Sequence, residues 1–362
     1  MAEVGTGSPA PSRSRLNMTV LNVGYPLLPV GPDSGGGAEQ ILSLVDHGLA
    51  AVGRRSIVIA AKSSRTAGEL IASPLANGEI SEDARAQAQY AHRELIEDCL
   101  ERYSVDLIHF HGLDFHSYLP ARSVPMLATL HLPVAWYPEA IFRETRISLN
   151  CVSRAQAIST ERSAKLPVVA NGIDLDTYRN LEGERDSLLW LGRICPEKGV
   201  HLAIEIAREL DLPMIVAGPV HPFRDHQLYF QNSIQPLLDA KRRYVGAVGL
   251  TAKIHLLANA RCLLIPSLVA ETSSLVAMEA TACGTPVIAF RSGALPEIVD
   301  HGKTGFIADS LRQMLEAVRF SSDISPEICR ATAEVRFDSR RMVSEYLSLY
   351  RSVVDEHSRP VT

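Results

Sequence analysis

Short apolar runs alternate with helical patterns along the chain, and this alternation constrains the fold more than any other feature. The runs are continuous rather than alternating apolar and polar, which is typical of parallel strands buried on both faces. In the first half the strand candidates are 18–24, 55–61, 105–112, 126–131, 148–153 and 166–172. A long helical pattern occupies 81–103. The first half therefore predicts a doubly wound α/β domain.

The same pattern begins again after a polar, turn-rich segment at 171–187. Five more strand candidates follow, at 187–192, 213–218, 244–249, 261–267 and 285–290. A chain of 362 residues is too long for one ordinary compact core, which also indicates two domains. We expect a mobile Gly-, Ser- and Pro-rich tail at 1–17, Rossmann-like domains at 18–178 and 179–337, and a final helix at 338–362.

Composition and charge exclude several classes of partner. The chain is 46% hydrophobic and 21% charged, as in soluble globular proteins, and its formal net charge is −5, which gives no basic field for nucleic acid. The six cysteines form no CxxC pair, so neither a disulfide framework nor a zinc knuckle is indicated. A reducing cytoplasm is the simplest location. No apolar run approaches ~20 residues, so no membrane span is predicted.

Two glutamates, Glu271 and Glu279, lie eight positions apart in an otherwise apolar stretch. Glutamate is rarely buried unless something pairs with it. Glu271 follows a strand candidate, so it lies on a carboxyl-end loop, where such sheets bind ligands, and a serine-capped helix carries Glu279. Two interpretations stay open. Either both glutamates are solvated, or they hold opposite ends of an elongated ligand whose diphosphate meets the helix N-terminus.

A second group of polar residues lies in LGRICPEKGV, at 191–200. Gly192 and Arg193 come directly off a strand, and Lys198 opens the next helix. Two cations at one sheet edge can neutralise a leaving diphosphate. The alternative is a pair of exposed surface cations.

Glycines and histidines mark the edge of the first domain. The turn SGGGAEQ, at 34–40, lets backbone approach a ligand closely, although it is not a GxGxxG dinucleotide fingerprint. Its alternative interpretation is a flexible turn before a helix. His109 and His111 have the HxH spacing of some metal ligands, but their place at a strand end favours a structural role. Trp136 and Tyr137 suit either stacking on an acceptor ring or ordinary packing.

The combination of GRxxxxKG with a later E-x7-E resembles the retaining glycosyltransferases of family 4, the glycosyl transferases group 1. The resemblance is strongest over 187–307 and weaker over 18–178. It implies the GT-B fold, in which two Rossmann-like domains face each other across a cleft and the final helix packs back on the first. It also implies metal-independent transfer of a sugar, with retention, from a nucleotide-diphosphate sugar to a hydroxyl acceptor, without a cofactor.

The resemblance also assigns roles to individual residues. Arg193 and Lys198 match the pair that contacts the donor diphosphate. Glu271 faces hydroxyls of the donor sugar, Glu279 holds the nucleotide ribose, and His131 lies beside the reacting sugar. The other donor-binding positions are Gly36, Gly37, Gly192, Gly218, Ser273, Ser274 and Leu275. From their place beside His131, and not from the resemblance, we expect His111, Trp136 and Tyr137 on the acceptor side.

One departure from the family pattern concerns the start of the helix that carries Glu279. The family usually has an aromatic-glycine pair where this chain has Ser273 and Ser274, so side chains stand where the backbone is usually bare. Two other activities stay open: a nucleotide-sugar epimerase or hydrolase on the same fold, and a catalytically weak nucleotide-sugar-binding protein. The acceptor is a small molecule, a glycan or a lipid-linked sugar. Residues 1–180 carry 16 Lys and Arg against 19 Asp and Glu, so charge does not indicate membrane docking.

Overall fold

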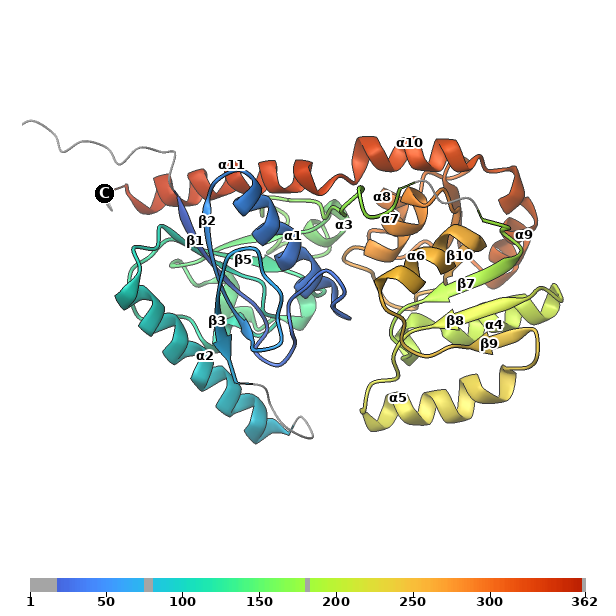
Figure 1. The fold of residues 1–362 in the computed structure, drawn as a ribbon, viewed down its shortest axis with the longest axis horizontal. Helices are drawn as coiled ribbons and strands as arrows, with labels where there is room; N and C mark the ends of the chain where they lie inside the picture. Colours follow the sequence, from blue (N-terminus) through green and yellow to red (C-terminus); the bar gives the residue numbers. More distant parts are fainter. Residues whose placement is uncertain (1–17, 75–80, 180–182, 360–362) are drawn as a thin grey trace, which may run out of the picture.

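The computed structural model describes residues 18–74, 81–179 and 183–359, and the predicted tail at 1–17 lies outside them. Two domains lie side by side, each built on a six-stranded parallel sheet (Figure 1). The first sheet contains β1 (Thr19–Val23), β2 (Arg55–Ala61), β3 (Glu69–Ser73), β4 (Leu107–Phe110), β5 (Met126–Leu130) and β6 (Ser148–Cys151). The second contains β7 (Ser187–Leu191), β8 (Met214–Ala217), β9 (Arg242–Tyr244), β10 (Ala260–Ile265), β11 (Val287–Phe290) and β12 (Gly305–Ala308).

The two sheets have the same topology. Their strand orders are β3-β2-β1-β4-β5-β6 and β12-β11-β10-β7-β8-β9, so the second, counted from its own first strand, repeats the first. This is the order of the doubly wound Rossmann fold. The predicted fold class, α/β with two Rossmann-like domains, is confirmed.

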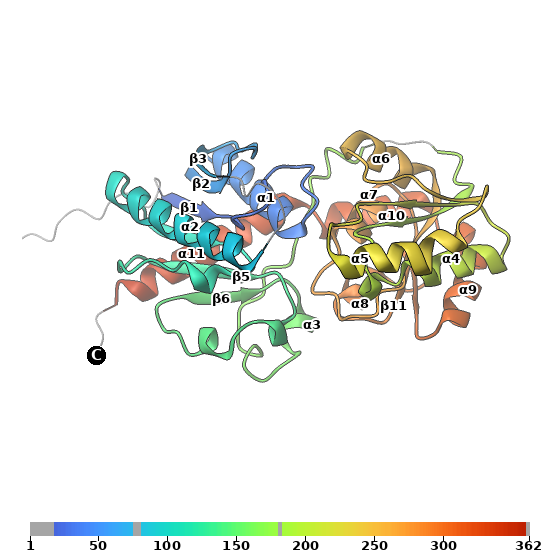
Figure 2. The ribbon, with the colours of Figure 1, turned by 90° about the horizontal axis from the view of Figure 1, so that it is seen from below.

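Helices cover both faces of each sheet. The first domain contains α1 (Gly37–Ala51), α2 (Glu82–Arg102) and α3 (Arg154–Ala157). The second contains α4 (Val200–Glu209), α5 (Arg224–Tyr229), α6 (Leu250–Asn259), α7 (Leu275–Ala282), α8 (Leu295–Ile298), α9 (Leu311–Phe320) and α10 (Pro326–Arg336). The chain then crosses back, and α11 (Ser339–His357) runs along the first domain (Figures 1 and 2).

Alternate strand residues supply two cores in each domain, as continuous apolar runs require. In β1, Val20 packs with α1 and α11, whereas Leu21 packs with α2. In β7, Leu188 packs with α4 and α9, whereas Leu189 packs with α7 and α10. Among the described residues, none of the helices combines the length and apolar character that crossing a membrane requires.

The strand predictions fail mainly at the sheet edges. The expected strand at 166–172 makes only an isolated bridge, because Pro167 has no N–H to donate to a ladder. The expected strand at 244–249 is displaced, since β9 ends at Tyr244. Strands β3 and β12 were not predicted. With β9, they are edge strands that pair on one side only, so their apolar pattern is weaker.

The two chain crossings between the domains touch each other. The Ile173 N–H donates to the Phe337 carbonyl at 2.7 Å, and the Ser339 N–H donates to the Ile173 carbonyl at 2.9 Å. A Cβ on Gly172 would lie 2.8 Å from the Ser339 Cα, so only glycine permits this contact.

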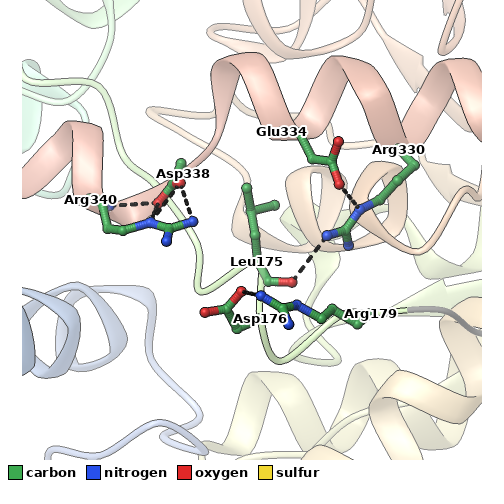
Figure 3. Close-up of a pocket in the computed structure, with 7 residues that line it drawn as sticks. All are labelled: Leu175, Asp176, Arg179, Arg330, Glu334, Asp338 and Arg340. Carbon is green, nitrogen blue, oxygen red and sulfur yellow. Dashed lines mark hydrogen bonds and ion pairs between the residues drawn. The ribbon is translucent and has the colours of Figure 1, made fainter.

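A surface pocket beside this crossing is lined by Leu175, Asp176, Arg179, Arg330, Glu334, Asp338 and Arg340 (Figure 3). Each of its three arginines pairs with a carboxylate of the same pocket, so its charges are matched internally. Arg330 also donates to the main-chain carbonyls of Leu175 and Tyr178, which fastens the connector to α10.

Candidate functional site

The shared strand order places a topological switch point between β1 and β4 in one sheet and between β7 and β10 in the other. Loops that leave the strands on either side of a switch point form the ligand crevice of such folds. The loops after β1, β4, β7 and β10 carry residues 36–37, His111, Arg193 and Glu271, respectively. The topology therefore brings together residues that are far apart in the sequence.

Lys198 and Glu271 form a part-buried ion pair on the second domain. The Lys198 Nζ donates to both carboxylate oxygens, at 2.6 and 2.8 Å, and the Ser267 hydroxyl donates to Oε1 at 2.6 Å. The two charged side chains are only 25% and 11% exposed. The interpretation of Glu271 and Lys198 as solvated surface charges is therefore wrong.

Two glycines with positive φ let neighbouring turns pack closely against the loop that carries Glu271. Gly199 has φ +63°, and a Cβ there would lie 2.1 Å from the Pro266 carbonyl oxygen. Gly293 has φ +53°, and a Cβ there would lie 2.1 Å from the Glu271 carbonyl oxygen. These backbone contacts lock the turn after β7 and the turn after β11 onto the loop that carries the carboxylate.

Gly192 and Gly218, both predicted at the donor site, lie backbone against backbone at the ends of β7 and β8. A Cβ on Gly218 would lie 1.7 Å from the Gly192 carbonyl oxygen. The next residue, Arg193, is exposed, and among the described residues no ion pair engages it. The structure thus presents one unpaired cation beside the paired Lys198.

Glu39 is a candidate that the sequence reasoning missed. It lies in the first turn of α1, it is buried, and its Oε1 has no hydrogen-bond partner. Its carboxylate occupies the space where a Cβ on Gly36 would stand. Burial raises the pKa of Glu39, and the Arg193 guanidinium of the other domain opposes that rise. The residue stands in the glycine-rich stretch at 34–40, of which only the glycines were considered.

Glu279 is buried in α7 and is also paired. Its Oε1 accepts hydrogen bonds from the Tyr178 hydroxyl and from the Lys253 Nζ, both at 2.7 Å. The interpretation of Glu279 as a solvated glutamate is therefore wrong. Its two partners come from the domain connector and from α6, which no local motif links to α7. Burial and the adjacent carboxylate both raise the pKa of Tyr178.

The segment before α7 joins the two domains. Ser274 caps the helix, its hydroxyl accepting from the Ala277 N–H, while the Ser273 hydroxyl is buried without a partner. Thr272 donates across the domain boundary to the His131 carbonyl at 2.9 Å. Leu275 lies against α1, where a Cβ on Gly37 would be 3.7 Å from its Cδ1.

A second set of hydrogen bonds between the domains involves α8. The Glu297 carboxylate accepts from the Arg154 N–H at 3.1 Å and from the Ala155 N–H, at the start of α3. The two domains are therefore linked by hydrogen bonds from the loop after β10 and from α8. Neither contact was predicted, because each joins loops of different domains.

His131 lies at the carboxyl end of β5 and is held at several points. Its N–H donates to the Tyr137 hydroxyl at 3.0 Å, and its Nε2 lies 3.2 Å from the His111 Nδ1. His111 Nε2 lies 3.1 Å from His109 Nδ1, which also meets the Tyr350 hydroxyl at 2.7 Å. Burial lowers the pKa of His131 to about 3 and the pKa of His109 and His111 well below 6.5. The three rings are therefore neutral at neutral pH.

The hydrogen-bond partners define one consistent set of proton positions, in which His109 Nδ1 accepts from both the Tyr350 hydroxyl and His111 Nε2. The Asn150 Nδ2 donates to the next main-chain carbonyl, so its Oδ1 accepts from the Thr129 hydroxyl at 2.8 Å. Thr129 then accepts from His109 Nε2, also at 2.8 Å. His109 Nδ1 accepts from His111 Nε2, and His111 Nδ1 accepts from His131 Nε2. In this arrangement the neutral His131 ring has its proton on Nε2 and its lone pair on Nδ1.

The three residues predicted on the acceptor side differ in their exposure and contacts. Trp136 is 60% exposed and is free to stack on a ring. Tyr137 is buried, and its hydroxyl accepts from the N–H groups of His131 and Leu132, so its predicted stacking role is replaced by support of that turn. His111 is also buried, and it contacts His131 rather than the surface.

Comparisons with known proteins agree with this architecture. Residues 177–319 match the family model described as glycosyl transferases group 1. The lipopolysaccharide 1,2-N-acetylglucosaminetransferase of Salmonella typhimurium is 26% identical over 229 residues, which cover 56% of this chain and 58% of that protein. The D-inositol 3-phosphate glycosyltransferase of Paenarthrobacter aurescens is 29% identical over 241 residues, or 58% of each chain. The match thus spans little more than half the length of these curated relatives.

Solved structures resemble nearly the whole chain. The sucrose-phosphate synthase of Thermosynechococcus elongatus is 19% identical with a TM-score of 0.76, covering 94% of this chain and all of that one. A glycosyltransferase involved in avilamycin A biosynthesis is 21% identical with a TM-score of 0.71, covering 93% and 98%. At these identities the likeness shows the fold, which is GT-B. Residues 177–319 thus match the glycosyl transferases group 1 model, and the chain has the GT-B fold.

Proposed function

We propose that this protein is a retaining glycosyltransferase that moves a sugar from a nucleotide-diphosphate sugar to a hydroxyl acceptor without a metal ion. The observation that carries the proposal is the paired Lys198 and Glu271 beside the unpaired Arg193, at the N-terminus of α7. A diphosphate needs cations where charge develops on departure, and a sugar needs acceptors for its hydroxyls. This edge supplies both within one locked set of loops.

The residue roles follow from this arrangement. Arg193 and Lys198 stabilise the diphosphate as its bond to the anomeric carbon breaks and the sugar becomes oxocarbenium-like. A phosphate that engages Lys198 releases Glu271, still held by Ser267, to accept a sugar hydroxyl. Glu279 holds the ribose with the carboxylate oxygen that Lys253 does not engage. We assign no protein nucleophile.

The first domain supplies the acceptor side. The main-chain carbonyl of His131 accepts a hydrogen bond from Thr272, so this residue lies beside the loop that carries the donor-sugar carboxylate. Its neutral ring and its Nδ1 lone pair suit a hydrogen bond from a hydroxyl rather than contact with an anion. The exposed Trp136 provides a stacking surface for an acceptor ring.

Calorimetry on two glutamate variants tests the proposal. A thermal-shift screen of UDP, ADP and GDP first selects the nucleotide, since a bound ligand raises stability by mass action. One fold neighbour, of Anabaena, was solved in complex with UDP-glucose, which makes UDP the first choice. Glu279→Gln should weaken binding of the free nucleotide by about 1–3 kcal/mol, whereas Glu271→Gln should leave it nearly unchanged and lower turnover.

The control is Tyr178→Phe, which removes a hydrogen bond from the same Glu279 carboxylate and leaves its charge. It should reduce nucleotide affinity less than Glu279→Gln does. Equal losses in the two glutamate variants would contradict the assignment of one carboxylate to each end of the donor. Consumption of the donor without any acceptor would favour an epimerase or hydrolase, and binding without consumption would favour a binding protein.

Chelation tests metal independence. Turnover should survive EDTA, because Arg193 and Lys198 already provide the charge that a metal ion would bring to the diphosphate. Loss of turnover that Mn²⁺ or Mg²⁺ restores would contradict this part of the proposal.

A further inference from the structure

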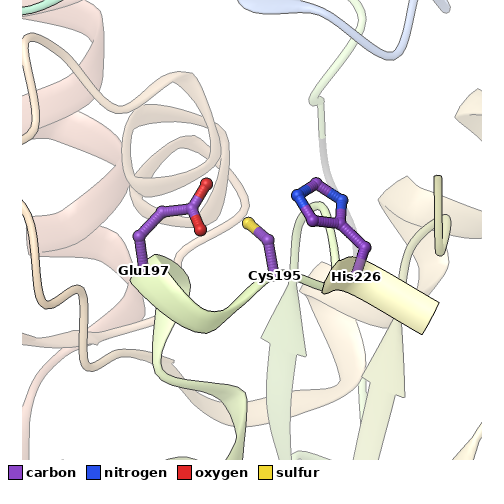
Figure 4. Close-up of side chains that lie close together, drawn as sticks. All are labelled: Cys195, Glu197 and His226. Atoms are coloured by element: carbon purple, nitrogen blue, oxygen red, sulfur yellow. The ribbon is translucent and has the colours of Figure 1, made fainter. Parts of the chain in front are cut away.

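Three metal-ligating side chains meet beside the loop that bears the two cations. Cys195 and Glu197 lie on the turn after β7, and His226 comes from α5. One ligand atom of each residue lies within 4.8 Å of the others. Figure 4 shows the Cys195 thiol between the Glu197 carboxylate and the His226 ring. A small shift of these side chains brings all three to the distances of a coordinated ion, about 2.0–2.3 Å from its centre.

One ring nitrogen of the cluster has no hydrogen-bond partner. Cys195 is buried, while Glu197 and His226 are half-buried and give access from solvent. The His226 Nδ1 is buried and has no hydrogen-bond partner. An unsatisfied buried ring nitrogen is uncommon in native structures, and a bound ion would satisfy it. The geometry and this unpartnered nitrogen are independent observations.

We propose that Cys195, Glu197 and His226 bind a Zn²⁺-type ion, with the fourth position taken by water. Sulfur, nitrogen and oxygen ligands in one tetrahedral set suit Zn²⁺, whereas Mg²⁺ and Ca²⁺ prefer oxygen ligands alone. On binding, the Cys195 S–H bond breaks, the proton goes to solvent, and a sulfur–metal bond forms from the same electron pair. No electron is gained or lost.

The ion would clamp the loop that carries the proposed diphosphate-binding cations. The Cys195 thiol donates to the Arg193 carbonyl at 3.5 Å, and the Lys198 N–H donates to the Cys195 carbonyl at 3.1 Å. Binding of His226 would fasten this turn to α5, which follows β8. The clamp restrains the loop and is not required for sugar transfer, so it is compatible with turnover in EDTA.

Cobalt substitution tests the site without any activity measurement. Untagged protein freed of metal by EDTA and dialysis is titrated with Co²⁺, which takes the same ligands and reports a thiolate by a sulfur-to-cobalt charge-transfer band. One equivalent should produce this band with the d–d absorption of a tetrahedral site, and Zn²⁺ should remove both. Zn²⁺ should also raise the midpoint of thermal unfolding.

Variants identify the ligands. Cys195→Ser should abolish the charge-transfer band, whereas Cys262→Ser, which changes a buried cysteine of β10 outside the cluster, should leave it intact. If Cys195→Ser does not fold, His226→Gln still tests the site, because this half-buried position tolerates an amide. His226→Gln should keep the band but weaken Co²⁺ affinity by about 10–100-fold or more, since even outer-shell partners contribute that much. A band absent from the wild type, a band that persists in Cys195→Ser, or an unchanged Co²⁺ affinity in His226→Gln would overturn the proposal.

Discussion

The two edges that face each other across the domain boundary are built from opposite chemistry on the same topology. On the second domain the key side chains carry charge, as in the Lys198–Glu271 and Lys253–Glu279 pairs. On the first domain the histidines at the strand ends are neutral, in a chain of hydrogen bonds from His131 to Tyr350. Strand order therefore decides where the ligand crevice lies, and the side chains at the strand ends decide what it can bind.

The difference extends into the sheets. Strands β4, β5 and β6 of the first sheet carry the polar side chains of His109, Thr129 and Asn150, which hydrogen-bond to each other and to tyrosines of α11. The corresponding strands of the second sheet, β10, β11 and β12, carry the apolar side chains of Leu263, Ala289 and Ile307. A fully satisfied buried polar network specifies one packing arrangement, so it fixes how the returning helix lies on the first domain.

The largest expected effect concerns the charged edge. Arg193→Ala and Lys198→Ala should each lower turnover about a hundredfold, because losing one charge-stabilising group typically costs about 3 kcal/mol of barrier. The variants should differ in stability. Lys198→Ala leaves the part-buried Glu271 without its cation and should lower the unfolding midpoint, whereas Arg193→Ala removes an exposed, unpaired side chain and should not. Steady-state kinetics and thermal unfolding measure both.

The matched control is Arg312→Ala on α9, which removes a highly exposed cation paired within its own helix. It should change neither turnover nor stability appreciably, since exposed pairs of this kind contribute little. Near-normal turnover in both Arg193→Ala and Lys198→Ala would contradict the proposal that this edge binds the diphosphate.

Much of the charged edge was predictable, because its residues follow strand ends at short sequence spacing. Arg193, Lys198, Glu271 and Glu279 were all located in this way. Their pairing was not, since the Lys198–Glu271 contact depends on the left-handed turn at Gly199. The partners of Glu279 and the ligand cluster that includes His226 are contributed by separate elements, so sequence distance hides them.

The neutral edge was less predictable for a physical reason. His109 and His111 stand two apart at a strand end, a place that favours a structural role over a metal site but does not show which partners the two rings have. Only the packing of α11 supplies the Tyr350 hydroxyl and excludes water. The stacking role expected of Tyr137 failed in the same way, because sequence alone did not show that its ring lies in the core.

The next largest expected effect is that acid destabilises the first domain more than the second. Histidines kept neutral in the fold have pKa values below the unfolded value near 6.5, so the unfolded state binds more protons and stability falls as pH drops below about 6.5. Burial lowers the pKa of His131 to about 3 and that of His92 to about 4. For His131 alone, acidification from pH 6.5 to 5 should cost about 2 kcal/mol, at about 1.4 kcal/mol per pH unit.

Hydrogen exchange at pH 7 and pH 5 measures this difference within one molecule. Amides of β1, β4 and β5 should lose more protection, after correction for intrinsic rates, than amides of β7 and β10. His357→Gln, at the exposed end of α11, is the control and should leave the difference unchanged. An equal loss in both sheets would contradict the description of the first edge as a buried, neutral network.

The smallest expected effect tests the proton positions in that network. With His131 protonated on Nε2, two-bond ¹H–¹⁵N correlation spectra of histidine-labelled protein should show the Nε2–H tautomer for His109, His111 and His131 alike. Thr129→Val removes the acceptor for His109 Nε2–H and leaves that donor unsatisfied, at a cost of about 1–3 kcal/mol, so the tautomers should become mixed along the chain.

Tyr350→Phe instead removes a donor that shares His109 Nδ1 with His111. The bond from His111 then has that lone pair to itself, and all three tautomers should persist while stability falls by about 1 kcal/mol. A wild-type His131 protonated on Nδ1 would mean that Tyr350 alone occupies the lone pair and that the chain reverses at His111. The ring would then offer a donor, not an acceptor, to a substrate hydroxyl.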